Sequence, residues 1–268
     1  MPRWRICHGN ASMVTENLTA IRREILRIAY LSGEGHVASS FSILEILAAL
    51  YDGAMLYRAA EPWWPSRDRF ILSKGHASLA LYAVLAEKGF FARSELDTFC
   101  APGSYFEGHP NRAIPGVEAT TGSLGHGLPL AVGAAMALRL HGQSANVFCL
   151  VGDGELQEGS NWEAIAIAAD RGLRNLIVIV DDNRNSVVPL SPLGKFADFG
   201  WDAVGVDGHD VAALARVLPR SPHDMPRAVI ARTVKGKGCA VMEESPAIWH
   251  HRSPASEEEL AALQEACQ

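Results

Sequence analysis

The sequence predicts an α/β protein with a doubly wound, mainly parallel sheet and helices on both of its faces. Two observations lead to this fold class. Short runs rich in Val, Ile and Leu, such as "NVFCLV" (146–151) and "NLIVIV" (175–180), alternate with segments whose apolar residues recur at helical spacing. The runs are almost continuously apolar, which is typical of strands that are covered on both faces of a parallel sheet.

The expected elements follow from the same periodicities. "TENLTAIRREILRIAYL" (15–31) has the spacing of an amphipathic helix, and "FSILEILAALY" (41–51) is apolar nearly all round, as a buried helix is. The remaining elements, in chain order, are a strand over 68–73, helices over 74–89 and 121–140, a strand over 146–151, a helix over 157–172, strands over 175–180 and 227–232, and a helix over 256–266. We expect one domain over residues 1–268, with an irregular segment over 1–14.

The composition describes a globular protein with a sizeable core, since 48 % of the 268 residues are hydrophobic. The net charge of −6 and the lack of a basic stripe argue against nucleic acid or an anionic membrane as the main partner. No apolar run reaches the roughly 18 residues of a membrane span, and no signal-like stretch is present, so we expect a cytoplasmic location. The five scattered cysteines fit reduced thiols and form no zinc motif.

Polar residues follow two of the predicted strands. Asp153, flanked by Gly152 and Gly154, comes directly after the first strand, and Asn183 follows the next strand thirty residues later. Because ligands bind beyond the carboxyl ends of parallel strands, both side chains are expected at a binding edge. A carboxylate, an amide oxygen and a nearby backbone carbonyl suit Mg²⁺, and the glycines would let the backbone bend sharply and approach a ligand closely.

Gly, Asp and Asn also dominate ordinary turns, so either motif alone is better explained by a turn. The two motifs together, on successive buried strands and at this separation, favour a metal site. A helix that follows Asp153 would also direct its N-terminal amides and its positive dipole end at an anion.

Six ordered motifs between residues 33 and 252 make the sequence similar to the transketolase family of thiamine diphosphate enzymes. They are "SGEGHVASS", "RDRFILSKGHA", "GHPNRAIPGVEATTGSLGHG", "GDGELQEGSNWEA", "DDNRNS" and "TVKGKG" with the later "WHHR". Gly-Asp-Gly followed by Asn at this spacing is the signature of thiamine diphosphate enzymes in general. The resemblance implies the thiamine diphosphate-binding fold and, within it, the domain that binds the diphosphate.

The resemblance implies a set of metal and diphosphate ligands. Asp153, Asn183 and the backbone carbonyl of Asn185 would coordinate Mg²⁺, for which Ca²⁺ or Mn²⁺ can substitute. Gly152 and Gly154 would lie against the diphosphate of thiamine diphosphate. All five positions belong to the two strand-end motifs.

The resemblance also implies residues farther along the cofactor. Gly122, Ser123 and Leu124 would line its aminopyrimidine ring, and Glu158 would lie at an interface between subunits that links two cofactor sites. His126 departs from the family, which commonly has glutamine at this point of the glycine-rich loop. The departure leaves the role of His126 open.

Four histidines match positions that transketolases place around the reactive carbon of the cofactor and the sugar. They are His36, His76, His109 and His250, and His76 also counts among the cofactor-binding residues. Imidazoles at these positions can hydrogen-bond the carbonyl and hydroxyl groups of a sugar and move protons. The "WHHR" motif leaves His251 as an alternative to His250.

Two further charged segments are open to more than one interpretation. Glu155, close to the Gly-Asp-Gly motif, is expected to be exposed. Lys235 and Lys237 of "VKGKG" either face the phosphates and the cleft or belong to a plain surface loop.

A full transketolase also has a pyrimidine-binding domain, which carries the glutamate that activates the cofactor, and a third domain. The six motifs resemble the first domain alone. The resemblance therefore implies the N-terminal subunit of a split transketolase, active only with a second subunit that carries the pyrimidine-binding and C-terminal domains, in an expected α₂β₂ assembly. The implied reaction moves a two-carbon ketol unit from a ketose, or its phosphate, to an aldose or its phosphate.

Three other functions fit parts of the sequence less well. A subunit of a 1-deoxyxylulose-5-phosphate-synthase-like or 2-oxo-acid decarboxylating enzyme would use the same cofactor, but "PGVEATTGSLG" favours transketolase. A non-catalytic scaffold subunit is disfavoured by the intact Asp153, Asn183 and four histidines. The sequence supports nicotinamide binding even less, since no G-x-G-x-x-G motif follows a strand.

Overall fold

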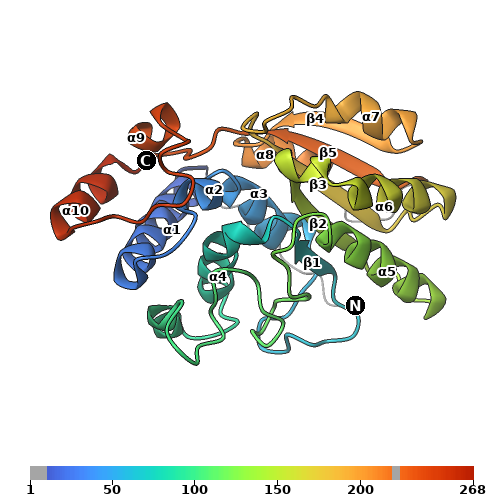
Figure 1. The fold of residues 1–268 in the computed structure, drawn as a ribbon. Helices are drawn as coiled ribbons and strands as arrows, with labels where there is room; N and C mark the ends of the chain where they lie inside the picture. Colours follow the sequence, from blue (N-terminus) through green and yellow to red (C-terminus); the bar gives the residue numbers. More distant parts are fainter. Residues whose placement is uncertain (1–10, 219–223) are drawn as a thin grey trace.

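The computed structural model describes residues 11–218 and 224–268 and confirms the predicted α/β fold class. Five parallel strands form one sheet in the order β1-β2-β3-β5-β4, with helices on both faces (Figure 1). The strands are β1 (Arg69–Leu72), β2 (Val147–Gly152), β3 (Leu176–Asp182), β4 (Asp202–Asp207) and β5 (Arg227–Arg232).

The helices agree with the predicted periodicities at most positions. They are α1 (Ala11–Ser32), α2 (Val37–Phe41), α3 (Leu44–Ala49), α4 (Ser78–Glu87), α5 (Gly127–Leu140), α6 (Gly159–Asp170), α7 (Pro192–Asp198), α8 (Val211–Val217), α9 (Ala240–Glu244) and α10 (Glu257–Ala266). Short helical segments of other types lie at Leu50–Ala54, Gly75–Ala77, Arg93–Thr98 and Gly154–Gln157.

Several parts of the chain differ from the expectation. No helix was expected at α7, α8 or α9, and α5 begins at Gly127 instead of residue 121. The helix expected over 41–51 is broken between α2 and α3 and continues as a wider turn to Ala54. α1 begins at Ala11, inside the segment 1–14 that was expected to be irregular, because no glycine or proline interrupts the chain from there to Ser32. Residues 1–10 of that segment lie outside the described part. β4 was not expected, since it is half-exposed and lacks a continuous apolar run.

Each face of the sheet has its own hydrophobic core. On β3, Ile177 and Ile179 point toward the core beneath α1, α2, α3 and α4, whereas Val178 and Val180 point toward the core beneath α5, α6 and α7. The alternation follows from the two-residue period of a strand. Both sides of the strand are buried, which explains why its sequence is continuously apolar.

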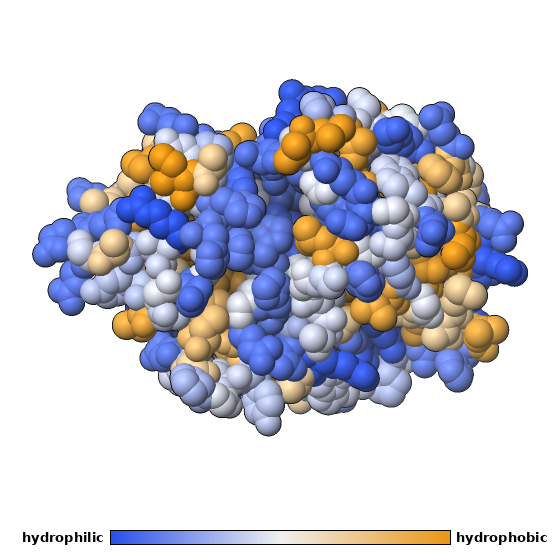
Figure 2. Space-filling model, in the orientation of Figure 1, coloured by the Kyte–Doolittle hydropathy of each residue, from blue (hydrophilic) through white to orange (hydrophobic). Residues whose placement is uncertain are grey.

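The outer side of the layer formed by α5 and α6 carries several exposed apolar residues. The exposed positions of α5 recur at helical spacing and include Leu130, Gly133, Ala137 and Leu140. Ile167 on α6, which packs beside α5, is also exposed. Figure 2 shows hydrophobic patches over this part of the surface. α5 is therefore apolar on its exposed side as well as on its buried side, which is typical of a helix that packs against another protein chain.

One helical stretch of the described residues, Val37–Ala54, is long and apolar enough to cross a membrane, but 89 % of it is buried inside the fold. Its side chains form part of the core beneath α1 to α4. The packing therefore accounts for its apolar composition.

Candidate cofactor and metal site

The ends of β2 and β3 bring the two strand-end motifs together, as the sequence predicted. Gly152 pairs with Asp181 in the parallel register, and the Asp153 N–H donates to the Asp181 carbonyl (3.1 Å). Asp153 is the first residue after β2, and Asn183 is the first residue after β3. The two side chains therefore start from neighbouring positions on the carboxyl edge of the sheet, where ligands bind in folds of this kind.

Asp153 carries a buried oxygen that has no partner. One carboxylate oxygen accepts a hydrogen bond from the Gly154 N–H (2.8 Å), while Oδ2 is buried without a partner. Burial raises the pKa of Asp153, and the nearby charges of Asp181 and Asp182 act in the same direction. A buried, unpaired carboxylate oxygen is costly, so the side chain fits a role as a cation ligand.

Asn183 is oriented by its neighbours. Its Nδ2 donates to the Asp181 carboxylate (3.0 Å), and its Oδ1 accepts from the Asn185 N–H (3.1 Å). Arg184 between them has a positive φ of 57°, so the chain turns back tightly. The amide oxygen keeps a second lone pair for a ligand. Asn185 is exposed, and its carbonyl was expected as the third metal ligand.

The described residues contain no group of three or more His, Cys, Asp or Glu side chains placed to hold a metal ion. Asp153 and Asn183 offer one carboxylate and one amide oxygen from this chain. Mg²⁺ suits such a sparse set, because it completes its coordination with phosphate oxygens and water. The available ligands therefore fit Mg²⁺ bound together with a diphosphate, and do not fit zinc.

The two glycines beside Asp153 leave room for a ligand. The chain turns there from β2 into the helical turn Gly154–Gln157, although neither Gly152 nor Gly154 has a positive φ. A Cβ at Gly152 would meet atoms of Lys74 no closer than 3.8 Å, and one at Gly154 would meet Ser186 at 3.8 Å. The protein itself leaves this space open, which fits the close approach of a diphosphate.

A buried ionic network lies beneath the edge, and the sequence did not predict it. Asp181 is fully buried and forms an ion pair with Lys74. Its carboxylate also accepts hydrogen bonds from Ser42 Oγ (2.9 Å), from the Asn183 amide and from the Thr233 hydroxyl. Four partners hold Asp181, and Asp181 in turn holds Asn183. The network thus fixes the position of a candidate metal ligand.

Three imidazole rings form a second cluster, the histidine group, made of His36, His76 and His250. The ring centroid of His36 lies 5.2 Å from that of His76 and 5.4 Å from that of His250, and the centroids of His76 and His250 are 6.1 Å apart. His36 precedes α2 and His76 follows β1, while a backbone bridge between His36 and Arg252 brings in the third ring.

The histidine group is uncharged near neutral pH. Burial lowers the pKa of His76 to about 2, with the nearby Lys74 and the other histidines adding to the shift. Burial and the neighbouring histidines lower the pKa of His36 to about 4. Burial also lowers the pKa of His250, and Lys235 contributes. A neutral imidazole offers one donor and one acceptor nitrogen, which is what polar recognition of a sugar requires.

Lys235 lies between the histidine group and the strand edge. Its Nζ is 2.6 Å from His250 Nδ1. Its pKa is lowered by burial and by the charge of Lys74, and raised in part by the charges of Asp181 and Asp153. Lys235 is only 7 % exposed, so the structure excludes a plain surface loop at this position. A charged Lys235 makes His250 Nδ1 the acceptor and leaves the proton on Nε2.

His250 lies beside both His36 and His76, while His251 stays an alternative contact to His36. His251 lies 4.5 Å from His36 by ring centroids, but its side chain is 57 % exposed and pairs with Glu34 (3.3 Å). His109 contributes to the lowered pKa of His36, and its ring packs against Gly122. A Cβ at Gly122, whose φ is +147°, would come within 2.9 Å of that ring. Only glycine therefore fits between His109 and the glycine-rich loop.

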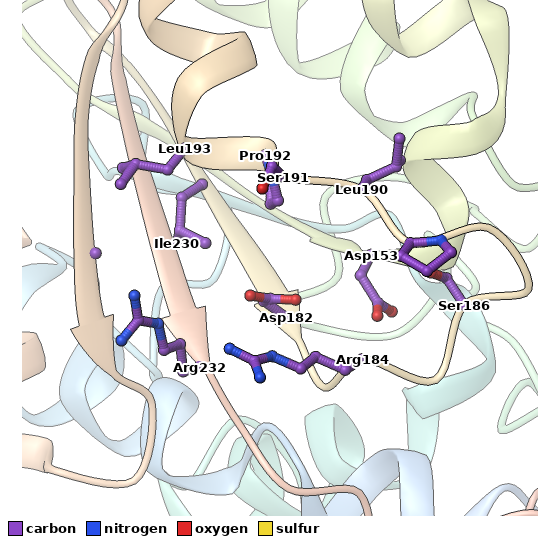
Figure 3. Close-up of a pocket in the computed structure, with 12 residues that line it drawn as sticks. Asp153, Asp182, Arg184, Ser186, Leu190, Ser191, Pro192, Leu193, Ile230 and Arg232 are labelled. Atoms are coloured by element: carbon purple, nitrogen blue, oxygen red, sulfur yellow. The ribbon is translucent and has the colours of Figure 1, made fainter.

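A cavity of about 490 Å³ adjoins the strand edge (Figure 3). Asp153 lines one side of it, and Asp182, Arg184 and Arg232 lie together on the other. Burial raises the pKa of Asp182, while the two arginines lower it. The cavity is large enough for part of a small charged ligand and opens beside the candidate metal ligands.

Residues 15–267 match the family described as transketolase, thiamine diphosphate binding domain. The chain belongs to this family. It is 37 % identical over 254 residues to one of the subunits of the apulose-4-phosphate transketolase of Phocaeicola vulgatus, a match that covers 91 % of this chain and 90 % of that protein. It is 42 % identical over 228 residues to human transketolase, in a match that covers 82 % of this chain but 36 % of the human protein.

Solved structures agree with this assignment. The transketolase of Campylobacter jejuni superposes with a TM-score of 0.87 at 28 % identity, covering 96 % of this chain and 43 % of the other. This transketolase domain thus spans nearly all of the Phocaeicola vulgatus protein and less than half of the human and Campylobacter jejuni enzymes.

Two acidic residues of this transketolase domain lie in different environments. Glu155 was expected to be exposed, which is wrong, because it is only 2 % exposed. Its carboxylate accepts hydrogen bonds from Ser73 Oγ, the Gly125 N–H (3.0 Å) and the Gly152 N–H (3.2 Å). Glu155 therefore ties the glycine-rich loop to the strand edge. Glu158 is exposed and packs against Gly125.

The glycine-rich loop of the transketolase domain presents its tip to solvent. Ser123 and Leu124 are both exposed. His126 is exposed as well, and its Nδ1 lies 3.1 Å from the Leu124 carbonyl within the same loop. The structure thus gives His126 a local partner, and gives the expected aminopyrimidine-lining residues an open surface.

Proposed function

We propose that this chain is the diphosphate- and Mg²⁺-binding subunit of a two-chain transketolase that moves a two-carbon ketol unit from a ketose, or its phosphate, to an aldose or its phosphate. One observation carries the proposal. The unpartnered Asp153 oxygen and the uncharged histidine group lie on the same side of one sheet, with Lys235 between them. A metal-diphosphate end and a sugar-binding end are therefore available side by side.

At the strand edge, this chain's residues bind and orient. Asp153, Asn183 and the Asn185 carbonyl would hold Mg²⁺, and the open space beside Gly152 and Gly154 would admit the diphosphate. Thiamine diphosphate, when bound, supplies the electron sink that lets a carbon–carbon bond beside a carbonyl break. Asp181, which is itself held by Lys74, would keep Asn183 in place.

At the histidine end, this chain's residues handle protons. Neutral His36, His76 and His250 can donate hydrogen bonds to the carbonyl of the ketose substrate and accept hydrogen bonds from its hydroxyl groups. Lys235 fixes which nitrogen of His250 carries the proton, so Nε2 is the atom that can give it to the sugar. His109 would add a further contact from the side of Gly122.

The partner proposed here is a second protein with a pyrimidine-binding domain and a C-terminal domain, in an α₂β₂ assembly. The match to a single subunit of the Phocaeicola vulgatus enzyme, over 90 % of the length of that protein, supports a split enzyme. The exposed apolar positions of α5, next to the exposed Glu158, offer a surface for such a partner. We propose a cytoplasmic location on the basis of sequence alone.

Mixing purified chains tests the function. The chain is combined with the candidate partner in the presence of Mg²⁺ and thiamine diphosphate, and ketol transfer is followed with ketose and aldose phosphates. The proposal predicts transfer by the mixture and none by either chain alone. Full transfer by this chain alone contradicts the split enzyme, and an assembly that binds the cofactor without turnover identifies a scaffold role.

A further inference from the structure

Two cysteines face each other across a short antiparallel contact between the segment that follows β5 and the residue that follows α10. Cys239 and Cys267 form an isolated antiparallel bridge, and the Gln268 N–H donates to the Gly238 carbonyl beside them (2.9 Å). This hydrogen bond joins the neighbours of the cysteines, so the cysteines are a non-hydrogen-bonded pair, whose Cα atoms are typically about 4.5 Å apart. Disulfides form at Cα separations of about 4.4–6.8 Å.

The two thiols are chemically different. The hydrogen bond from Cys267 lowers the pKa of Cys239 to about 7, and the backbone amides of Met242 and Val241 act in the same direction. The same hydrogen bond, together with burial, raises the pKa of Cys267. Cys239 is thus the thiolate and nucleophile of the pair, and Cys267 keeps its proton.

We propose that Cys239 and Cys267 form a reversible disulfide in response to a small peroxide. The Cys239 thiolate attacks a peroxide oxygen, the O–O bond breaks, and Cys239 becomes a sulfenic acid while the other oxygen leaves as water or an alcohol after protonation. Cys267 then gives up its proton and attacks the sulfenic sulfur, which expels hydroxide, and the proton and hydroxide leave as water. Two thiols are oxidised and one peroxide is reduced.

The burial of the pair selects the oxidant. Cys239 is 0 % exposed and Cys267 is 5 % exposed, so a hydroperoxide reaches the sulfurs far more readily than a protein disulfide does. Disulfides of proteins in reducing compartments are usually transient and regulatory, which fits a reversible bond.

The disulfide would anchor a loop that reaches the candidate site. Residues 233–239 connect β5 to α9, and Lys235 in this loop contacts His250. Arg22 of α1 donates to the carbonyls of Lys237 (2.9 Å) and Gln268 (3.0 Å), so α1 already bridges the two segments that the cysteines would join. A covalent bond at the end of this loop reduces the local opening of the loop.

Peroxide titration of the full chain tests the proposal. The protein is treated at neutral pH with a small excess of hydrogen peroxide, quenched with catalase, and analysed by intact mass and peptide mapping without reductant. We expect a loss of about 2 Da, reversed by dithiothreitol, from a cross-link between the peptides that contain Cys239 and Cys267. Amides of residues 234–239 are expected to exchange more slowly in the oxidised protein.

Matched variants separate this pair from general oxidation. Cys239→Ser and Cys267→Ser should each abolish the cross-link, whereas Cys100→Ser, which removes an exposed cysteine, should leave it intact. If Cys267→Ser folds poorly, Cys267→Ala serves instead, and dimedone should trap the sulfenic acid on Cys239. A gain of about 16 or 32 Da without a cross-link overturns the proposal. So does a cross-link that persists in Cys267→Ser, or one that leaves amide exchange in the loop unchanged.

Discussion

The two ends of the candidate site differ in how far this chain completes them. At the strand edge, Asp181 is fully buried with four partners, and what stays open is one oxygen of Asp153. At the histidine end, His250 is exposed and the rings of His36 and His76 are half-buried. The difference indicates that the strand edge is preorganised within this chain, while the histidine end is open, where the proposed sugar and second chain would close it.

Asp153→Asn breaks the preorganised end and should have the largest effect. Mutation of a residue that hydrogen-bonds a metal ligand commonly lowers metal affinity by about 10–100-fold. Removal of the charge of the ligand itself should therefore weaken Mg²⁺-dependent cofactor binding by at least about 100-fold. The free energy of unfolding should not fall, because the substitution neutralises a buried carboxylate that has one oxygen without a partner. Calorimetric titration of the assembled enzyme measures the affinity, with the exposed Asp170→Asn as the matched control.

Lys74→Met breaks the network that holds the edge. It leaves the Asp181 charge buried without its partner cation, which should lower the free energy of unfolding by about 3–5 kcal/mol. Urea denaturation measures the change. Lys88→Met removes the cation of a surface pair with Asp52 and should cost less than about 1 kcal/mol. Equal losses for the two variants would show that the Lys74–Asp181 pair is not the support of the edge.

Leu130→Glu tests whether the proposed partner chain binds on α5. A charge at the centre of an apolar contact should weaken association with the partner by roughly 10–100-fold. Analytical ultracentrifugation of the mixed chains measures the affinity. Leu31→Glu places the same charge on an exposed leucine of α1 and should have little effect. Tight association of the Leu130 variant would place the interface on another surface.

The histidine end should appear in the pH dependence of stability. The pKa of His76 is about 2 when folded against 6.5 in the unfolded chain, so the unfolded state binds the proton more readily between these values. Stability is therefore lost as the pH falls below about 6.5, by about 2 kcal/mol from His76 at pH 5. His76→Asn should reduce this loss in urea denaturation at pH 7 and pH 5. The exposed His141→Asn should not.

The sequence predicted the polar residues that follow individual strands. Asp153 and Asn183 stand out because each follows an apolar run, and the structure places both at one edge. Lys74 and Asp181 were missed because they lie 107 residues apart, and no periodicity connects an ion pair between distant elements. The burial of Glu155 was missed for the same reason, since Ser73 is 82 residues away.

The roles of the loops could not be predicted from the sequence in the same way. "VKGKG" is compatible with a surface loop, and only the packing of Lys235 against His250 shows that it is buried. β4 escaped because an edge strand alternates between half-buried and exposed residues and lacks the continuous apolar run of β3. Local patterns thus identified the central strands and their ends, whereas contacts between distant segments required the fold.

The most direct test is to measure thiamine diphosphate binding by this chain, by the candidate partner and by their mixture, each with Mg²⁺ and with EDTA. A preorganised diphosphate end and an incomplete reactive end predict tight binding by the mixture with Mg²⁺, weak Mg²⁺-dependent binding by this chain alone, and loss of both in EDTA. Binding by this chain alone that equals the mixture, or binding that ignores Mg²⁺, would contradict the account.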